Sequence, residues 1–209
     1  MIEALLPDPR RPGSTRIIVA GRPAWTVPAD AVATLALVVG QAIRGDLTEQ
    51  LDQAADEEGA FRAGLRALER RAHAERELAT KLQRRGHPPR AIGAAIARLR
   101  RLELLDDVAF ARQFIAGRTE RGRGPIRLRR DLALLGVTRE IVDPLLAALA
   151  QESGDPLARA RELIVRRARS MASIAVDVRR RRLVAFLARR GYRGDDAIRL
   201  VNEVLRSAA

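Results

Sequence analysis

The residues best placed to do chemistry in this chain are its arginines. Arginine supplies 38 of the 39 basic residues, against 26 acidic ones, and the formal net charge is +13. The charge is unevenly distributed, because residues 1–60 hold five basic and nine acidic side chains whereas residues 61–209 hold 34 and 17. Such a surplus favours a polyanionic partner, either nucleic acid or an acidic protein surface. The alternative is a solvated charged surface without a partner.

The densest group of arginines lies in residues 118–130, which also contain two glycines and a proline. Gly122, Gly124 and Pro125 predict a loop that opens a new helix, and the free amides at a helix N-terminus can bind phosphate or carboxylate. The glycines do not match the phosphate-cradling pattern GxxxxGK. A plain turn between helices with solvated arginines therefore stays open beside the interpretation as a binding segment.

Few other residues suggest catalysis or metal binding. The chain has no cysteine, which excludes disulfides, thiol nucleophiles and thiolate metal sites, and its two histidines, His73 and His87, belong to different helical features. The adjacent Asp106 and Asp107 could act in catalysis or bind a metal, but Asp106 directly precedes an apolar helical pattern and is typical of an N-cap. We expect no catalytic residue, no cofactor and no metal.

The elements that must position the arginines show an internal repeat. The same helix ending, two leucines four residues apart and then a glycine, occurs at Leu78, Leu82 and Gly86, at Leu128, Leu132 and Gly136, and at Leu183, Leu187 and Gly191. The glycines are 50 and 55 residues apart, and an apolar helical face resumes after each one. This spacing predicts a tandem array of helical repeats, with each glycine forming a left-handed C-cap.

The chain is expected to be mainly α-helical, with five segments. Residues 1–14 are rich in proline and predict a flexible leader. Residues 15–60 predict a β-hairpin, Thr15–Val19 with Ala24–Val27, followed by helical stretches at 31–39 and 47–58, the second capped by Thr48. Three-helix repeats are expected at 61–105, 106–153 and 154–209, with the first boundary near Phe61, where the charge changes sign.

Several residues of the last repeat have structural interpretations that compete with binding. Four adjacent arginines, 179–182, spread around most of a helix, so about two of them can face one partner. Arg189 and Arg190 precede a glycine as Arg84 and Arg85 do, where the helix dipole favours cations even without a ligand. Phe186 and Tyr192 are expected to pack in the core rather than to stack on bases.

The order of several motifs resembles the bacterial recombination regulators of the RecX family. These motifs are Ala67-Leu68 with Arg71, Glu77-Leu78, Lys81-Leu82, Gly86, Leu105-Asp106-Asp107 with Phe110-Ala111, Arg118, Gly122, Leu132 and Leu135-Gly136-Val137. The resemblance covers nearly the whole chain, and the segment before the array is similar to the N-terminal extension of longer members. Two departures are Ala74, where a polar residue is common, and the absence of the usual tyrosine between Phe61 and Leu65.

The resemblance implies a non-enzymatic modulator of homologous recombination, DNA repair and the SOS response. Such a protein binds the RecA recombinase filament in its helical groove and inhibits strand exchange, ATP hydrolysis and coprotease activity. We expect a cytoplasmic monomer that contacts RecA and the DNA phosphate backbone but no membrane. The contact residues, chosen for arginine density and expected exposure, are Arg84, Arg98, Arg101, Arg118, Arg121, Arg123, Arg127, Arg130, Arg166, Arg180 and Arg181.

Two other functional classes remain as alternatives. Helices joined by a glycine turn also describe the helix-turn-helix of a DNA-binding transcription regulator, although a regulator usually has one recognition helix rather than three units. Such a regulator would bind one duplex sequence far more tightly than random DNA. An enzyme has little support, because no histidine, carboxylate or glycine constellation with catalytic spacing is present.

Overall fold

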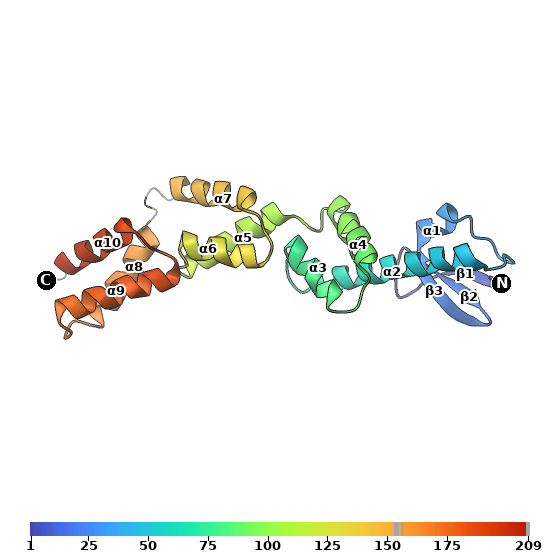
Figure 1. Ribbon diagram of the computed structural model, residues 1–209, viewed down its shortest axis with the longest axis horizontal. Coiled ribbons are helices and arrows are strands. Elements are labelled where there is room, and N and C mark those ends of the chain that lie inside the picture. Colours follow the sequence, from blue (N-terminus) through green and yellow to red (C-terminus); the bar gives the residue numbers. More distant parts are fainter. Residues whose placement is uncertain (153–154, 156, 208–209) are drawn as a thin grey trace. The chain divides into compact units, whose positions relative to one another are not determined.

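The structure is a computed structural model of the 209-residue chain and describes residues 1–152, 155 and 157–207. The chain divides into two compact units, residues 1–106 and residues 107–209 (Figure 1). The described part contains one three-stranded sheet and ten helices, so the prediction of a mainly α-helical fold is confirmed. Over these residues, no helix combines the length and the apolar character that crossing a bilayer requires.

The first unit begins with an antiparallel sheet of strand order β1-β2-β3, formed by Ala4–Pro7, Ser14–Val19 and Arg22–Pro28. The predicted hairpin is present as β2 and β3. Its two-residue turn, Ala20-Gly21, has φ of 51° and 70°, as a type I′ turn requires. Both turn amides donate hydrogen bonds to the carboxylate of Glu3 at 3.0 and 2.7 Å, which ties the turn to the segment that precedes β1.

The prediction of a flexible leader over residues 1–14 is wrong for its first half. Residues 4–7 form β1, which pairs with β2 from Ala4 opposite Ile18 to Pro7 opposite Thr15. Ile2 is completely buried in the core of the sheet. Proline is tolerated here because Pro7 ends an edge strand, where a missing N–H breaks no ladder.

Two helices cover the sheet, α1 (Ala29–Thr34) and the first part of α2 (Gly45–Leu68). The helix predicted for 31–39 is shorter than expected, because the chain turns at Ala36, whose φ is 47°. The second helix begins at Gly45, so Thr48 lies in its first turn and is not the N-cap. The buried core between sheet and helices consists of Ile2, Ile17, Val27, Leu37 and Leu51.

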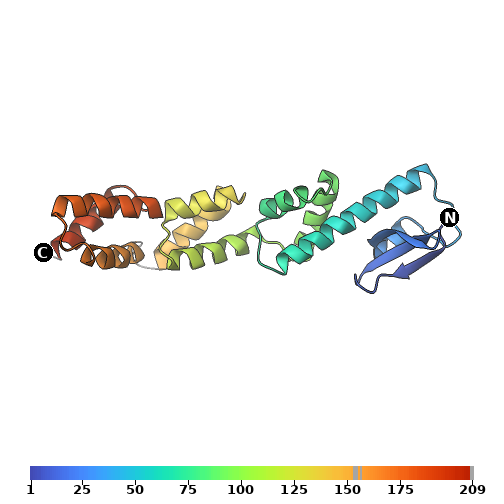
Figure 2. The same ribbon diagram turned by 90° about the horizontal axis from the view of Figure 1, so that it is seen from below.

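Helix α2 continues without a break through the predicted boundary near Phe61. Its N-terminal half packs on β3, and its C-terminal half packs with α3 (Glu75–Gln83) and α4 (Pro89–Arg101), as Figure 2 shows. The core of this three-helix group includes Ala60, Phe61, Leu78, Leu82, Ile96 and Leu99. The sheet and the first repeat therefore share one helix.

The second unit contains two further three-helix groups. Helices α5 (Asp107–Glu120), α6 (Pro125–Leu134) and α7 (Arg139–Glu152) contact one another, as do α8 (Ala158–Arg169), α9 (Val176–Arg190) and α10 (Asp195–Arg206). Helix α5 begins one residue after Asp106, where an N-cap residue would lie. The expected boundary at 153/154 lies outside the described residues.

The three predicted glycine endings adopt the same conformation. Gly86, Gly136 and Gly191 have φ of 85°, 91° and 91°, the left-handed region that glycine tolerates. After each one, the next amide donates to the carbonyl five residues earlier, from His87 to Leu82 at 3.3 Å, from Val137 to Leu132 at 3.0 Å and from Tyr192 to Leu187 at 3.0 Å. These are Schellman caps, and they confirm the repeat that the leucine and glycine spacing predicts.

Candidate functional site

The glycines of the arginine-rich loop form a packing junction between the second and third repeats. The Gly124 amide donates to the Arg190 carbonyl at 2.7 Å, and the Ile126 amide donates to the Gly191 carbonyl at 3.3 Å. A Cβ on Gly124 would lie 2.7 Å from the Gly191 carbonyl, and a Cβ on Gly191 would overlap the backbone of Arg127. The amides of Gly124, just before α6, and of Ile126, in its first turn, are therefore engaged by protein, and this loop is not an open phosphate cradle.

Three expected contact arginines in this region already have partners within the chain. Arg123 and Arg127 both pair with Asp131, the second with its Nε 3.1 Å from Oδ1. The Arg118 guanidinium stacks on the Phe114 ring, 4.8 Å from its centroid. These contacts hold each guanidinium near α5 and α6. The ion pairs engage some of the N–H donors of Arg123 and Arg127, whereas stacking leaves the N–H donors of Arg118 available to a ligand.

Arg190 stabilises the junction rather than merely the end of α9. Its guanidinium lies 4.7 Å from the centroid of the Phe186 ring, and its Nη1 donates to the Arg121 carbonyl at 3.0 Å. Arg167 stacks on the same ring at 4.7 Å. Phe186 thus packs against the core with arginines on its ring, and Tyr192 is buried, so the interpretation of both aromatics as packing residues is confirmed.

In the first unit, Arg98 is part of a buried ionic cluster. Glu58 is completely buried, and its carboxylate accepts from Arg98 Nη1 at 2.8 Å, from Arg62 Nε at 2.6 Å and from Ser14 Oγ at 2.5 Å. The Arg98 guanidinium also lies 3.9 Å from the centroid of the Phe61 ring. Arg98 therefore has a structural role that the sequence does not reveal.

The four adjacent arginines of α9 have different environments. Arg179 is buried on the same stripe as Leu183 and Leu187. The Nε of Arg180 donates to the side-chain oxygen of Asn202 at 2.8 Å, whereas Arg181 and Arg182 are exposed. Only part of this run can therefore face a partner, as the geometry of a helix predicts.

Six expected contact arginines are available to a partner. Each is exposed and has no ion pair, side-chain hydrogen bond or ring contact with any residue that the structure describes, and they are Arg84, Arg101, Arg121, Arg130, Arg166 and Arg181. Arg189 and Arg193 share this property, but the sequence assigns the first to helix capping and does not single out the second. No sequence pattern shows that the end of α9 meets the start of α6.

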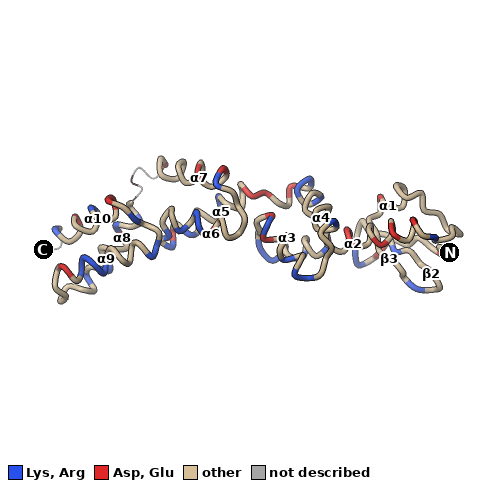
Figure 3. Tube along the Cα trace, viewed as in Figure 1, with Lys and Arg blue, Asp and Glu red and all other residues tan. Residues whose placement is uncertain are grey.

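Basic residues dominate the second unit. It holds 22 arginines and 12 acidic residues, and in its described part six of these arginines form ion pairs. Figure 3 shows basic segments along α6, α8 and α9, and in the first unit acidic residues both on α2 and outside it. The uncompensated positive charge therefore lies on the helical repeats.

A polar network surrounds the buried His73, which lies between α2 and α3. The His73 Nε2 accepts from Lys81 Nζ at 3.3 Å, so its Nδ1 carries the proton and donates to Glu77 Oε2 at 2.9 Å. Arg71 also pairs with Glu77, at 2.5 Å. Burial lowers the pKa of His73, and the hydrogen bonds from Arg71 and His73 hold the pKa of Glu77 low against the opposing effect of burial. The network joins α3 to the preceding turn and is structural.

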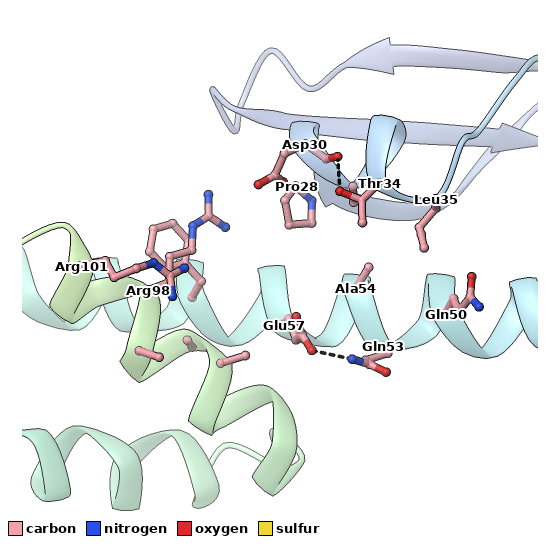
Figure 4. Close-up of a pocket in the computed structure, with 15 residues that line it drawn as sticks. Pro28, Asp30, Thr34, Leu35, Gln50, Gln53, Ala54, Glu57, Arg98 and Arg101 are labelled. Atoms are coloured by element: carbon pink, nitrogen blue, oxygen red, sulfur yellow. Dashed lines mark hydrogen bonds between the residues drawn. The ribbon is translucent and has the colours of Figure 1, made fainter.

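A cavity of about 400 Å³ lies beside α2 in the first unit. Figure 4 shows Arg98 and Arg101 at one end and Leu35 and Gln50 at the other. Its polar lining includes carboxylates, guanidinium groups and side-chain amides. Gln53 donates a hydrogen bond to Glu57 at 2.8 Å. Within the described residues, no three histidine or carboxylate side chains are grouped as metal ligands would be. The lining of this cavity therefore does not resemble a catalytic constellation.

Comparisons with known proteins match the helical part of the chain. Family models described as the first, second and third three-helix domains of RecX match residues 60–99, 106–146 and 154–201. A regulatory protein RecX of Halorhodospira halophila is 41% identical over 134 residues, which cover 64% of this chain and 80% of that relative. One of Streptomyces coelicolor is 34% identical and covers 68% of this chain and 74% of that relative.

Two solved structures share the fold. A crystal structure of regulatory protein RecX superposes with a TM-score of 0.80 at 19% identity, and the match covers 97% of this chain and 98% of the other. A RecX structure from Lactobacillus salivarius gives a TM-score of 0.62 at 19% identity, over 73% of this chain and 97% of the other. The arrangement of a small N-terminal sheet before three helical repeats is therefore found in another protein.

Proposed function

This chain belongs to the RecX family, and on that premise we propose that it is a non-enzymatic regulator of the RecA recombinase. It binds the RecA filament on DNA, in the helical groove, and inhibits strand exchange, ATP hydrolysis and coprotease activity. Its role is in homologous recombination, DNA repair and the SOS response, in the cytoplasm. It acts as a monomer, because contacts along a filament supply several binding points without a second copy.

The observation that carries this proposal is the set of arginines without ionic partners on the repeats. A filament of protein and DNA presents acidic side chains and phosphates, and exposed guanidinium groups on successive repeats suit such a surface. The free arginines come from all three repeats, for example Arg84 from the first, Arg130 from the second and Arg181 from the third. Several weak contacts along one partner add through effective concentration.

The experiment compares inhibition of RecA by two variants with the same change in charge. In the first variant, the free arginines Arg121, Arg130 and Arg181 become glutamate. In the control, three exposed arginines outside the repeats become glutamate: Arg10, Arg22 and Arg44. Both variants lose the same charge, so a difference between them reports position and not net charge.

Wild type is expected to suppress ATP hydrolysis and strand exchange by RecA on single-stranded DNA. The repeat variant should need roughly 10- to 100-fold more protein for half-inhibition, because three screened contacts contribute roughly 0.5–1 kcal/mol each, and the control should need less than about threefold more. No inhibition by saturating wild-type protein would contradict the proposed function. Equal shifts in the two variants would contradict the choice of contact residues.

A further inference from the structure

A second arginine cluster lines an open cavity where α6 begins and α9 ends. The cavity has a volume of about 330 Å³, and four guanidinium-bearing residues surround it: Arg127, Arg130, Arg189 and Arg193. The remaining lining residues are Ile126, Ala188 and Gly191, which offer no charged side chain. No carboxylate takes part in the lining, although Asp131 and Asp195 lie near in the sequence.

The arginines around this cavity retain most of their hydrogen-bonding capacity. Arg130, Arg189 and Arg193 are exposed and have no ion pair or side-chain hydrogen bond with any residue in the described part of the chain. Arg127 shares Asp131 with Arg123, and only its Nε is engaged, at 3.1 Å. Four like charges around one cavity repel one another, and an anion bound among them reduces this repulsion, so binding of an anion is favoured.

The backbone holds this cavity in shape. The carbonyls of Arg190 and Gly191 would repel an anion, but they already accept the amides of Gly124 and Ile126 at 2.7 and 3.3 Å. The close approach of Gly191 to the start of α6, where a Cβ would overlap Arg127, fixes the distance between the two walls. The arginines thus stand on two helices that are joined by backbone hydrogen bonds.

We propose that this cavity is a binding site for the phosphodiester backbone of a nucleic acid strand. A planar guanidinium binds phosphate oxygens in pairs, and consecutive phosphodiesters supply a charge at every nucleotide, which suits four clustered arginines. The other lining residues have no polar side chain to bind base edges, so the site is expected to read the backbone and not the sequence. This deepens the proposed function, on which it rests for its biological role.

The test uses the full chain and a fluorescent oligonucleotide of 30 thymidines, without RecA. In the cavity variant, Arg130, Arg189 and Arg193 become alanine, and these exposed side chains have no side-chain partner to lose among the residues that the structure describes. In the matched control, the exposed residues Arg112, Arg139 and Arg206 of the same unit become alanine. A second variant, with lysine in place of the same three cavity arginines, keeps the charge but loses the guanidinium geometry.

Fluorescence anisotropy at 50–200 mM salt gives affinity and its salt dependence. Each phosphate contact to a single strand adds about 0.7 to the slope of log affinity against log salt concentration. At 0.1 M salt, one contact therefore raises the affinity about fivefold relative to 1 M salt. The cavity variant is therefore expected to bind up to about 100-fold more weakly, with a slope smaller by about 2. The control should stay within about threefold of wild type, and the lysine variant should recover the slope but only part of the affinity.

Two results would overturn the inference. Equal weakening in the cavity variant and the control would show that only the general field of the unit attracts DNA. An equal loss of affinity for a polyglutamate peptide would instead assign the cavity to an acidic protein surface. Because RecA is absent from this assay, neither result bears on the proposed inhibition of RecA. A failure to inhibit RecA would likewise not contradict binding of DNA at this cavity.

Discussion

Replacing Glu58 with alanine tests whether the buried ionic cluster holds the first unit together. The Glu58 carboxylate is the only acceptor, among the described contacts, that joins Ser14 of the sheet, Arg62 of α2 and Arg98 of α4. Its removal leaves two guanidinium groups without their counter-charge. Because the cluster lies between the sheet and the first repeat, the loss should weaken both parts.

The expected cost follows from the exposure of the cluster. Removing one partner of a buried ion pair typically costs about 3–5 kcal/mol. The side chains of Arg62 and Arg98 keep 17% and 30% exposure, so water partly replaces the lost carboxylate and the lower end applies. A loss of about 3 kcal/mol in a unit of 106 residues corresponds to a fall in Tm of about 12 °C or more.

Trp25 makes the measurement specific to the first unit. It is the only tryptophan in the chain, and its Nε1 donates to Asp52 at 2.6 Å, so its fluorescence reports unfolding there. The control is Asp56→Ala, which removes an exposed carboxylate from the same helix and should change stability by less than about 0.5 kcal/mol. Equal shifts in Tm for Glu58→Ala and this control would refute the reasoning.

Three further perturbations test other contacts. Gly191→Ala should destabilise the second unit by about 2 kcal/mol or more in melts followed by circular dichroism, because a Cβ strains the left-handed backbone and overlaps α6; Gly93→Ala, in open space, should be neutral or stabilising. Below pH 6.5 the unfolded chain takes up a proton on His73 whereas the buried ring, with its lowered pKa, does not. The first unit should therefore lose up to about 1.4 kcal/mol per pH unit between pH 6.5 and the folded pKa, and His73→Gln should reduce this dependence. Arg190→Ala should destabilise the second unit by about 1–2 kcal/mol through its lost ring and carbonyl contacts, and Arg189→Ala should not.

Each of these expectations has a clear opposite result. A Gly191 variant as stable as wild type would show that α6 and α9 can move apart. A wild-type Tm that is flat from pH 7.5 to 5.5 would contradict the neutral, buried state of His73. Equal effects of the two α9 arginine variants would contradict the division between a structural and an available arginine.

Local conformational needs explain why the helix endings could be predicted from the sequence. Gly86 and Gly136 follow an apolar helical stripe, and a left-handed residue there closes the Schellman hydrogen bonds of its own helix. A Schellman cap involves only a few consecutive residues. The pattern of leucines followed by glycine therefore predicts it without knowledge of the fold. The same argument holds for the turn at Gly21.

Contacts between distant residues explain what the sequence did not reveal. Strand β1 exists because Ala4–Pro7 finds a partner in β2, whereas its prolines alone favour a leader. Arg98 meets Glu58 from 40 residues away, and the end of α9 meets Gly124 from 66 residues away. A count of arginines cannot separate those with a carboxylate nearby from those facing solvent, because that depends on how the helices pack.

Because α2 is continuous, an insertion or deletion within it changes the orientation of the sheet relative to the first repeat. One added residue turns an α-helix by about 100°, so an insertion between Leu51, which faces the sheet, and Phe61, which faces the first repeat, would rotate one buried face away from its partner. Seven residues restore the orientation to within about 20°. Only a step of about two helical turns would keep both buried faces in phase, and even that step would move the sheet by about 10 Å along α2 and separate Ser14 from Arg98, which Glu58 joins.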